Sequence, residues 1–102
     1  MKEIFEKQKE FQKLVGNDIT TQEFKNTMFL GLFEEVAELM KETPFKKHKK
    51  HQTFNRDNFL EECADAQLYL INLVLSEANS KEFLEIVKAK ITKNFKRQKN
   101  DY

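Results

Sequence analysis

The stretches FEEVAEL (residues 33–39) and LEECADAQLYL (residues 60–70) each carry two acidic side chains three positions apart. On an α-helix, residues at positions i and i+3 lie on one face, so each stretch presents two carboxylates side by side. The chain has only two Gly and one Pro in 102 residues and shows no strand-like alternation, so we predict long helices in an all-α fold. The two acidic pairs are Glu35 with Glu38 and Glu62 with Asp65.

These two pairs lie in unusually apolar surroundings. When residues 22–41 are wound as a helix, Glu35 falls inside the apolar arc and Glu38 lies at its edge. Residues 57–75 are apolar over most of their circumference, and the second acidic pair lies in the polar stripe that remains. Carboxylates in such a setting must be paired, protonated or bound to a cation.

Start and stop signals divide the chain into four helices. The signals are a Gly16-Asn17-Asp18 stop, a capping box of Thr20 with Glu23, a Thr43-Pro44 stop, and the capping residues Asn55 and Asn79. We predict a four-helix bundle-like protomer that forms a single domain over residues 1–102. Its helices span about residues 2–15, 21–42, 56–77 and 81–99, and the inward stripe of the first consists of Ile4, Gln8, Phe11 and Val15.

Composition limits the class of protein. The formal net charge of +1 gives no reason to expect nucleic acid or a membrane as a partner. The most apolar run, residues 64–75, is too short for a transmembrane span and carries Asp65 and Asn72. The single Cys63 cannot form an internal disulfide and is expected to be a small buried core residue in a cytoplasmic protein. The apolar third helix needs more cover than one protomer provides, which predicts a homo-oligomer.

If the second and third helices are antiparallel neighbours, their four carboxylates converge on one pocket. The charges then repel one another strongly, and a hard divalent cation relieves that repulsion. A ligand set made only of oxygen favours Mg²⁺ or Mn²⁺ over zinc. Because Mg²⁺ bound by carboxylates keeps open positions for water and phosphate oxygens, the site predicts a phosphate-bearing ligand.

The last helix offers cationic and amide groups at its C-terminal end. The apolar stripe that begins at Phe83 continues in register into polar residues, so the same face turns cationic along the helix. Such groups can hold phosphates, and a tyrosine just beyond the helix can stack on a base. The candidate substrate-binding residues are Lys90, Asn94, Arg97 and Tyr102.

These motifs resemble those of the all-α nucleoside triphosphate pyrophosphohydrolases, a family that includes MazG-type enzymes and dimeric dUTPases. The hallmark of that family is E-x-x-E followed, on the next long helix, by E-x-x-D, which here are Glu35 to Glu38 and Glu62 to Asp65. The dimeric dUTPase branch adds K-x3-N-x2-R-x4-Y, with a spacing matched by Lys90, Asn94, Arg97 and Tyr102. The chain departs from that branch in its shorter length and in Asp101, where the branch usually has a Gly.

The resemblance implies Mg²⁺-dependent hydrolysis of a nucleoside or deoxynucleoside triphosphate to the monophosphate and pyrophosphate, by attack of water at the α-phosphorus. It implies metal binding by all four carboxylates, with Glu35 or Glu38 also acting in catalysis by orienting the water. It further implies that Lys90, Asn94 and Arg97 hold phosphates or sugar. Sites in this family are commonly completed across a dimer, and a dimer or a tetramer is expected here.

Other interpretations stay open. The acidic quartet can be a solvated face or a set of ion pairs with Lys41 or Arg56, and the cations of the last helix can simply complement its dipole. Asn72 is either a substrate contact or a satisfied core amide. The basic run KKHKKH at residues 46–51, with two histidines, is either a solvated loop or an attractor of phosphates. A pyrophosphatase acting on a phosphoribosyl-nucleotide, and a non-catalytic helical module that binds a nucleotide or another subunit, are the alternative functions.

Overall fold

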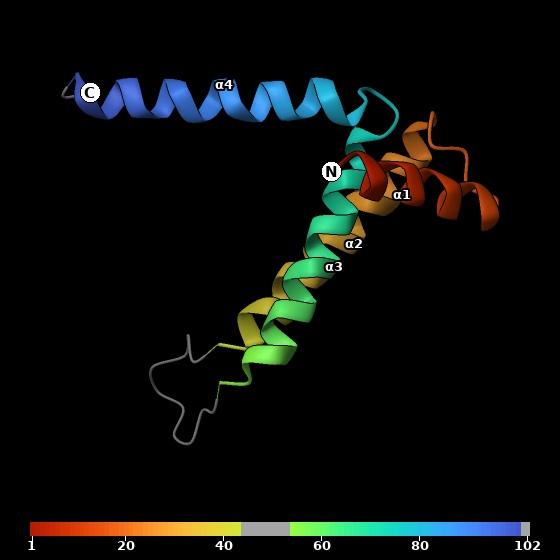
Figure 1. The fold of residues 1–102 in the computed structure, drawn as a ribbon. Coiled ribbons are helices and arrows are strands. Elements are labelled where there is room, and N and C mark those ends of the chain that lie inside the picture. The colour runs from red at the N-terminus through yellow and green to blue at the C-terminus, as the bar shows by residue number, and fades with distance from the viewer. Residues whose placement is uncertain (44–53, 101–102) are drawn as a thin grey trace.

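The computed structural model describes residues 1–43 and 54–100, and every regular element in these ranges is a helix. The predicted all-α chain of four helices in a bundle-like arrangement is therefore confirmed (Figure 1). The basic run at residues 46–51 and Tyr102 lie outside the described residues. The helices are α1 (Lys2–Leu14), α2 (Gln22–Lys41), α3 (Arg56–Val74) and α4 (Ser80–Lys99).

Gly16 ends α1, as predicted. Its φ of 81° lies in the left-handed region, which glycine adopts without a steric cost. The Asn17 N–H donates to the Gln12 carbonyl at 2.9 Å and the Gly16 N–H donates to the Lys13 carbonyl at 3.1 Å. This pair of bonds is a Schellman motif, which satisfies carbonyls at the helix end that have no partner within the helix.

The predicted capping box at Thr20 and Glu23 is wrong by one residue. Thr21 caps α2, because its hydroxyl oxygen accepts a hydrogen bond from the Phe24 N–H at 3.1 Å. Thr20 instead donates to Asp18 Oδ1 from its backbone N–H at 3.0 Å and from its hydroxyl at 2.6 Å. Asp18 thus competes successfully for the Thr20 hydroxyl, and these hydrogen bonds lower the pKa of its carboxyl.

Asparagines cap α3 and α4, as predicted. Asn55 Oδ1 accepts from the backbone N–H of Asn58 at 3.1 Å, and Asn79 Oδ1 accepts from that of Glu82 at 2.9 Å. A side-chain oxygen in this position satisfies one of the free donors at a helix start. Both caps therefore fix where the helices begin.

The third helix ends at Val74, earlier than the predicted end near Glu77. The N–H groups of Glu77 and Ala78 both donate to the Val74 carbonyl, at 2.9 and 3.0 Å, and close a turn directly after the helix. The Lys25 ammonium donates to the Glu77 carboxylate at 2.7 Å and lowers the pKa of Glu77. This contact joins residues that are distant in sequence and ties the turn to α2.

The hydrophobic core joins α1, α3 and the start of α4. Phe5, Ile71 and Leu75 are buried, and the rings of Phe5 and Phe83 lie 6.1 Å apart. The predicted stripe on α1 is wrong in part, because Ile4, Phe11 and Val15 are exposed while Phe5 and Gln12 are buried. The buried face lies one residue further along the helix, a rotation of about 100°, because α1 packs against both α3 and α4.

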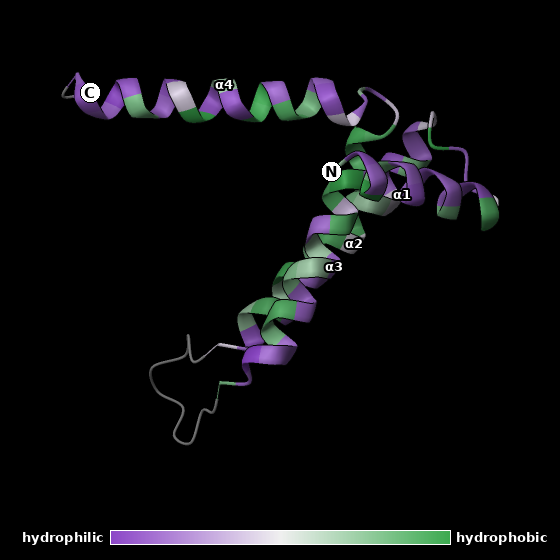
Figure 2. Ribbon diagram, in the orientation of Figure 1, coloured by the Kyte–Doolittle hydropathy of each residue, from purple (hydrophilic) through white to green (hydrophobic). Residues whose placement is uncertain are grey.

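The longest helix contact is the antiparallel hairpin of α2 and α3 (Figure 1). Beyond its start, α4 projects away from this hairpin. Figure 2 shows hydrophobic and hydrophilic bands alternating along the helices. Within residues 1–43 and 54–100, no helix has an apolar stretch long enough to cross a membrane.

Candidate metal centre and adjoining pocket

The hairpin of α2 and α3 has a regular antiparallel register. Near one end, the Asn72 amide donates to the Met28 sulfur at 3.4 Å, and both residues are buried. One turn along, Gly31 of α2 lies against the ring of Tyr69 of α3. One turn further, Glu35 meets the acidic residues of α3. Each step of three or four residues forward on α2 thus matches a similar step backward on α3, which is why two acidic pairs distant in sequence meet.

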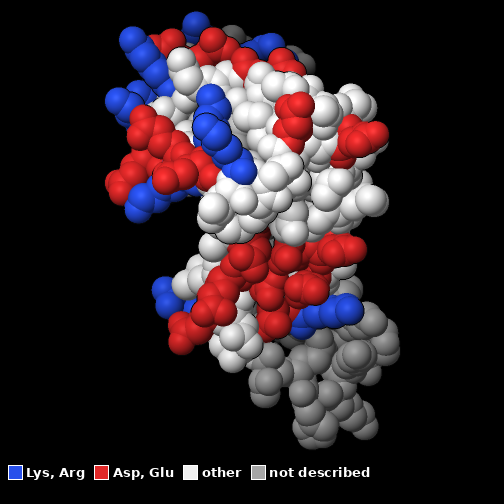
Figure 3. Space-filling model, turned by 90° about the vertical axis from the view of Figure 1, so that its right-hand side faces the viewer, with Lys and Arg blue, Asp and Glu red and all other residues white. Residues whose placement is uncertain are grey.

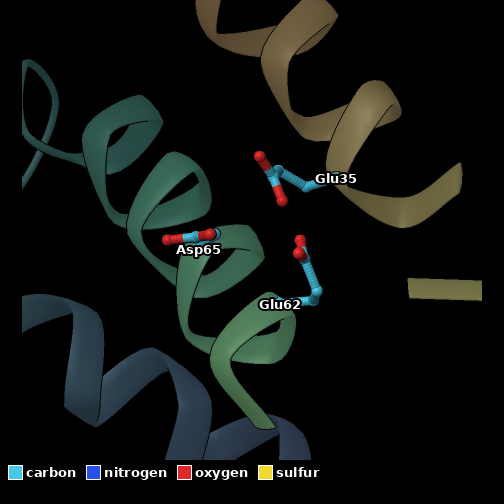
Figure 4. A group of neighbouring side chains, drawn as sticks. All are labelled: Glu35, Glu62 and Asp65. Carbon is cyan, nitrogen blue, oxygen red and sulfur yellow. The ribbon is translucent and has the colours of Figure 1, made fainter. Parts of the chain in front are cut away.

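Three of the four predicted ligands form one cluster. Glu35, Glu62 and Asp65 each offer a carboxylate oxygen, and these oxygens all lie within 4.8 Å of one another. Figure 4 shows Glu35 reaching from α2 toward Glu62, with Asp65 beside them on α3. Glu35 and Glu62 are half-buried, whereas Asp65 is exposed. The cluster is therefore anchored between the helices and open to solvent on one side. Figure 3 shows that acidic side chains gather in a band across one face of the molecule.

Glu38, the fourth predicted ligand, lies at the rim. It is exposed and is not part of the group of three, but its carboxyl is close enough to Glu62 to interact by a hydrogen bond. Arg56, an alternative ion-pair partner for the quartet, instead lies 3.8 Å from the carboxylate of its neighbour Asp57.

The electrostatics of the cluster are those of crowded carboxylates. Hydrogen bonding with Glu35 raises the pKa of Glu62, and burial and the negative charges of Glu35 and Asp65 raise it further, while a hydrogen bond with Glu38 lowers it. One oxygen of each carboxyl group, the Oε2 atom of Glu35 and of Glu62, is nevertheless buried without a hydrogen-bond partner among the described residues. A buried acceptor without a partner is costly unless a proton or a cation satisfies it.

The donor set fits a hard divalent cation. All donors are carboxylate oxygens, which hard cations such as Mg²⁺ and Mn²⁺ prefer. Glu35, Glu62 and Asp65 would hold the ion, and the exposed position of Asp65 would leave room for water or phosphate oxygens.

An open pocket of about 470 Å³ adjoins the cluster. Asp65 belongs to both, because it also lines the pocket, which lies between α1, α2 and α3. The walls combine aromatic and apolar faces with the amides of four side chains. The other lining residues are Gln8, Phe11, Gln12, Val15, Asn17, Met28, Leu68, Tyr69 and Asn72.

Asn72 is a satisfied core amide. It is 5% exposed, accepts a hydrogen bond from Gln8 Nε2 at 2.9 Å and donates to the Met28 sulfur. These bonds join α1, α2 and α3 at the inner end of the pocket. The pocket itself was not predicted from the sequence, although Gln8 and Gln12 lie one turn apart and so share a face of α1.

The candidate residues of α4 are not brought to the carboxylates of their own chain. Lys90 and Asn94 are exposed and Arg97 is half-buried, on the part of α4 that projects away from the hairpin (Figure 1).

Cys63 is half-buried, not fully buried as predicted.

The fold and the site define a class, the all-α proteins that carry paired carboxylates on an antiparallel helix hairpin. A family model described as dUTPase matches residues 1–96, and the chain belongs to this all-α dUTPase family. The predicted resemblance is thereby confirmed, and membership makes the chain a hydrolase of the nucleotide-hydrolysing kind. No curated protein and no solved structure matches the chain significantly.

Proposed function

We propose that this protein is a divalent-metal-dependent pyrophosphohydrolase that converts a nucleoside or deoxynucleoside triphosphate and water to the monophosphate and pyrophosphate. The observation that supports it best is that Asp65 belongs both to the carboxylate cluster and to the amide-lined pocket. A ligand that fills the pocket with its nucleoside therefore extends its phosphates toward the carboxylates. Family membership supports the same reaction class.

Glu35, Glu38, Glu62 and Asp65 would hold Mg²⁺, with Mn²⁺ as a substitute. The ion would lower the pKa of water, polarise the α-phosphate and neutralise the leaving pyrophosphate. Glu35 or Glu38 would orient the water for attack at the α-phosphorus and accept its proton. Lys90, Asn94 and Arg97 would contact phosphates or sugar, and Tyr102 would contact the base.

The pocket suits a planar base with donor and acceptor edges. The rings of Phe11 and Tyr69 offer flat apolar surfaces, while the amides of Gln8 and Asn17 offer donors and acceptors. Since the family is described as dUTPase, dUTP is the first substrate to test.

A second copy of the chain is the partner that the proposal requires. Along α4, apolar residues alternate with hydrophilic ones (Figure 2). The apolar side chains are exposed, and the cations lie on a helix that projects away from the hairpin that carries the acidic cluster. Packing against a second copy would cover the apolar side chains and bring the cations to the carboxylates of that copy. The exposed apolar residues of α4 are Ile86, Val87, Ile91 and Phe95.

Pyrophosphate release from a panel of ribo- and deoxyribonucleoside triphosphates, including dUTP, tests the activity. We expect release of pyrophosphate and the monophosphate with Mg²⁺ or Mn²⁺ and none with EDTA, because the carboxylates alone repel the triphosphate. A folded protein that binds Mn²⁺ and nucleotide but releases nothing would support the non-catalytic module instead. Activity confined to a phosphoribosyl-nucleotide would redefine the substrate but keep the reaction class.

Light scattering coupled to size exclusion tests the assembly. We expect the unmodified chain to elute as a dimer or tetramer, and a Phe95→Glu variant to lose that assembly, because a buried carboxylate without a partner is strongly unfavourable. Lys93→Glu is the matched control, since Lys93 is exposed and lies on the side of α4 opposite Ile91 and Phe95. A monomeric unmodified chain, or equal behaviour of both variants, would contradict an interface on this face.

A further inference from the structure

Gly31 lies in the middle of α2, where it faces the ring of Tyr69. A Cβ atom at this position would lie 2.5 Å from Tyr69 Cζ and 2.8 Å from Cδ1, and closer still to Cε1. Such distances are incompatible with van der Waals contact, so any side chain here forces the ring to move. Glycine inside a helix is destabilising relative to alanine, and the close approach of the ring accounts for its use here.

The Tyr69 ring connects the two halves of the candidate site. It lines the pocket, one turn of α3 after Asp65 and one turn before Asn72. Asn72 is held by hydrogen bonds to α1 and α2, so the inner wall next to the ring is fixed. With the α2 backbone behind it and the fixed amide beside it, the open pocket is where a displaced ring would move.

We propose that Gly31 is a positioning residue for the nucleoside pocket. By having no side chain, it seats the Tyr69 ring against α2 and keeps the pocket beside the carboxylates open to a planar base. The role in nucleoside binding rests on the proposed function, whereas the seating of the ring does not. The two parts therefore need separate measurements.

Acrylamide quenching of tyrosine fluorescence tests the seating without any nucleotide. The chain has no Trp and two Tyr, so a Tyr102→Phe background leaves Tyr69 as the only emitter. In this background we expect Gly31→Ala to raise the quenching constant about twofold, because the displaced ring becomes more accessible to the quencher. An unchanged constant in a folded variant overturns the proposal.

Steady-state kinetics test the consequence for binding. We expect Gly31→Ala to raise KM about tenfold while kcat changes less than about twofold, because the ring contacts the nucleoside and not the carboxylate cluster. The affinity for Mn²⁺ should be unchanged. An equal loss in kcat and in Mn²⁺ affinity would mean that Gly31 sets the spacing of the metal ligands, which overturns the assigned role.

A Tyr69→Leu background is the matched control. There, adding Gly31→Ala should leave KM unchanged and raise the melting temperature, because alanine favours the helix once the ring is gone. A further rise in KM in this background would show that Gly31 does not act through Tyr69. If Gly31→Ala alone fails to fold, the Tyr69→Leu/Gly31→Ala variant decides. A folded double variant shows that the alanine side chain clashes with the Tyr69 ring, and an unfolded double variant refutes that clash. If no triphosphate is hydrolysed, the proposed function fails while the quenching result still decides the seating.

Discussion

If the proposed reaction is correct, we expect Glu62→Gln to lower pyrophosphate release by roughly 10²- to 10³-fold, because it removes a charged ligand of the metal that stabilises the developing charge. The same change raises the melting temperature of the metal-free protein. Glu62 faces Glu35 and Asp65 across the hairpin, and its Oε2 atom is buried without a partner among the described residues. Glutamine keeps the volume of the side chain, removes its charge and supplies a donor to the facing carboxylate.

The free energy of unfolding of the metal-free protein should fall as the pH rises through the pKa of Glu62. Hydrogen bonding with Glu35, burial and nearby negative charge raise the pKa of Glu62 above its ordinary value of 4.5, so the folded metal-free protein binds this proton more tightly than the unfolded chain does. The resulting stabilisation is fully present below pH 4.5 and is lost as the pH rises through the raised pKa. Thermal melts between pH 4 and pH 8, a range of about four pH units, should show this loss in the unmodified protein and less of it in Glu62→Gln.

Glu61→Gln is the matched control for this experiment. Glu61 is adjacent in sequence, carries the same charge and is exposed, and it is not part of the cluster. We expect this variant to keep turnover, and to gain stability from added Mg²⁺ as the unmodified protein does, whereas Glu62→Gln should gain little. Equal losses of turnover in the two variants, or a lower melting temperature for metal-free Glu62→Gln, would refute a ligand role for Glu62.

The sequence predicts those parts of the site that depend on local spacing. Carboxylates at i and i+3 share a helix face whatever the tertiary structure. The convergence of Glu35, Glu62 and Asp65 further required that α2 and α3 be antiparallel neighbours in a register that sets the two acidic pairs side by side. The helix starts at Asn55 and Asn79 are equally local, because a cap uses a hydrogen bond across three residues.

Features that depend on contacts between helices were not predictable in this way. The contact of Gly31 with Tyr69, and the pocket that Tyr69 lines, require the exact register of the hairpin. The contact between Lys25 and Glu77, which holds the turn after α3 against α2, joins residues that are distant in sequence. The direction of α4 depends on where the Phe83 ring packs in the core, and no periodicity within α4 contains that information.

Because α4 projects away from the hairpin, we expect two inactive variants to restore activity to each other. Lys90 and Asn94 lie on the projecting part of α4, away from the carboxylates of their own chain (Figure 1). If a second copy supplies these groups, each site consists of the carboxylates of one chain and α4 of the other. A Glu62→Gln chain and a Lys90→Ala/Asn94→Ala chain should each be nearly inactive alone.

Co-refolding the two variants in equal amounts should restore about a quarter of the unmodified activity in a dimer, since half of the dimers are mixed and each mixed dimer has one intact site of two. Refolding each variant alone is the control and should restore no activity. If α4 instead serves the carboxylates of its own chain, every site in the mixture carries one lesion and no activity returns. Recovered activity therefore separates sharing between copies from completion within one chain, because only sharing reunites the intact carboxylates with an intact α4.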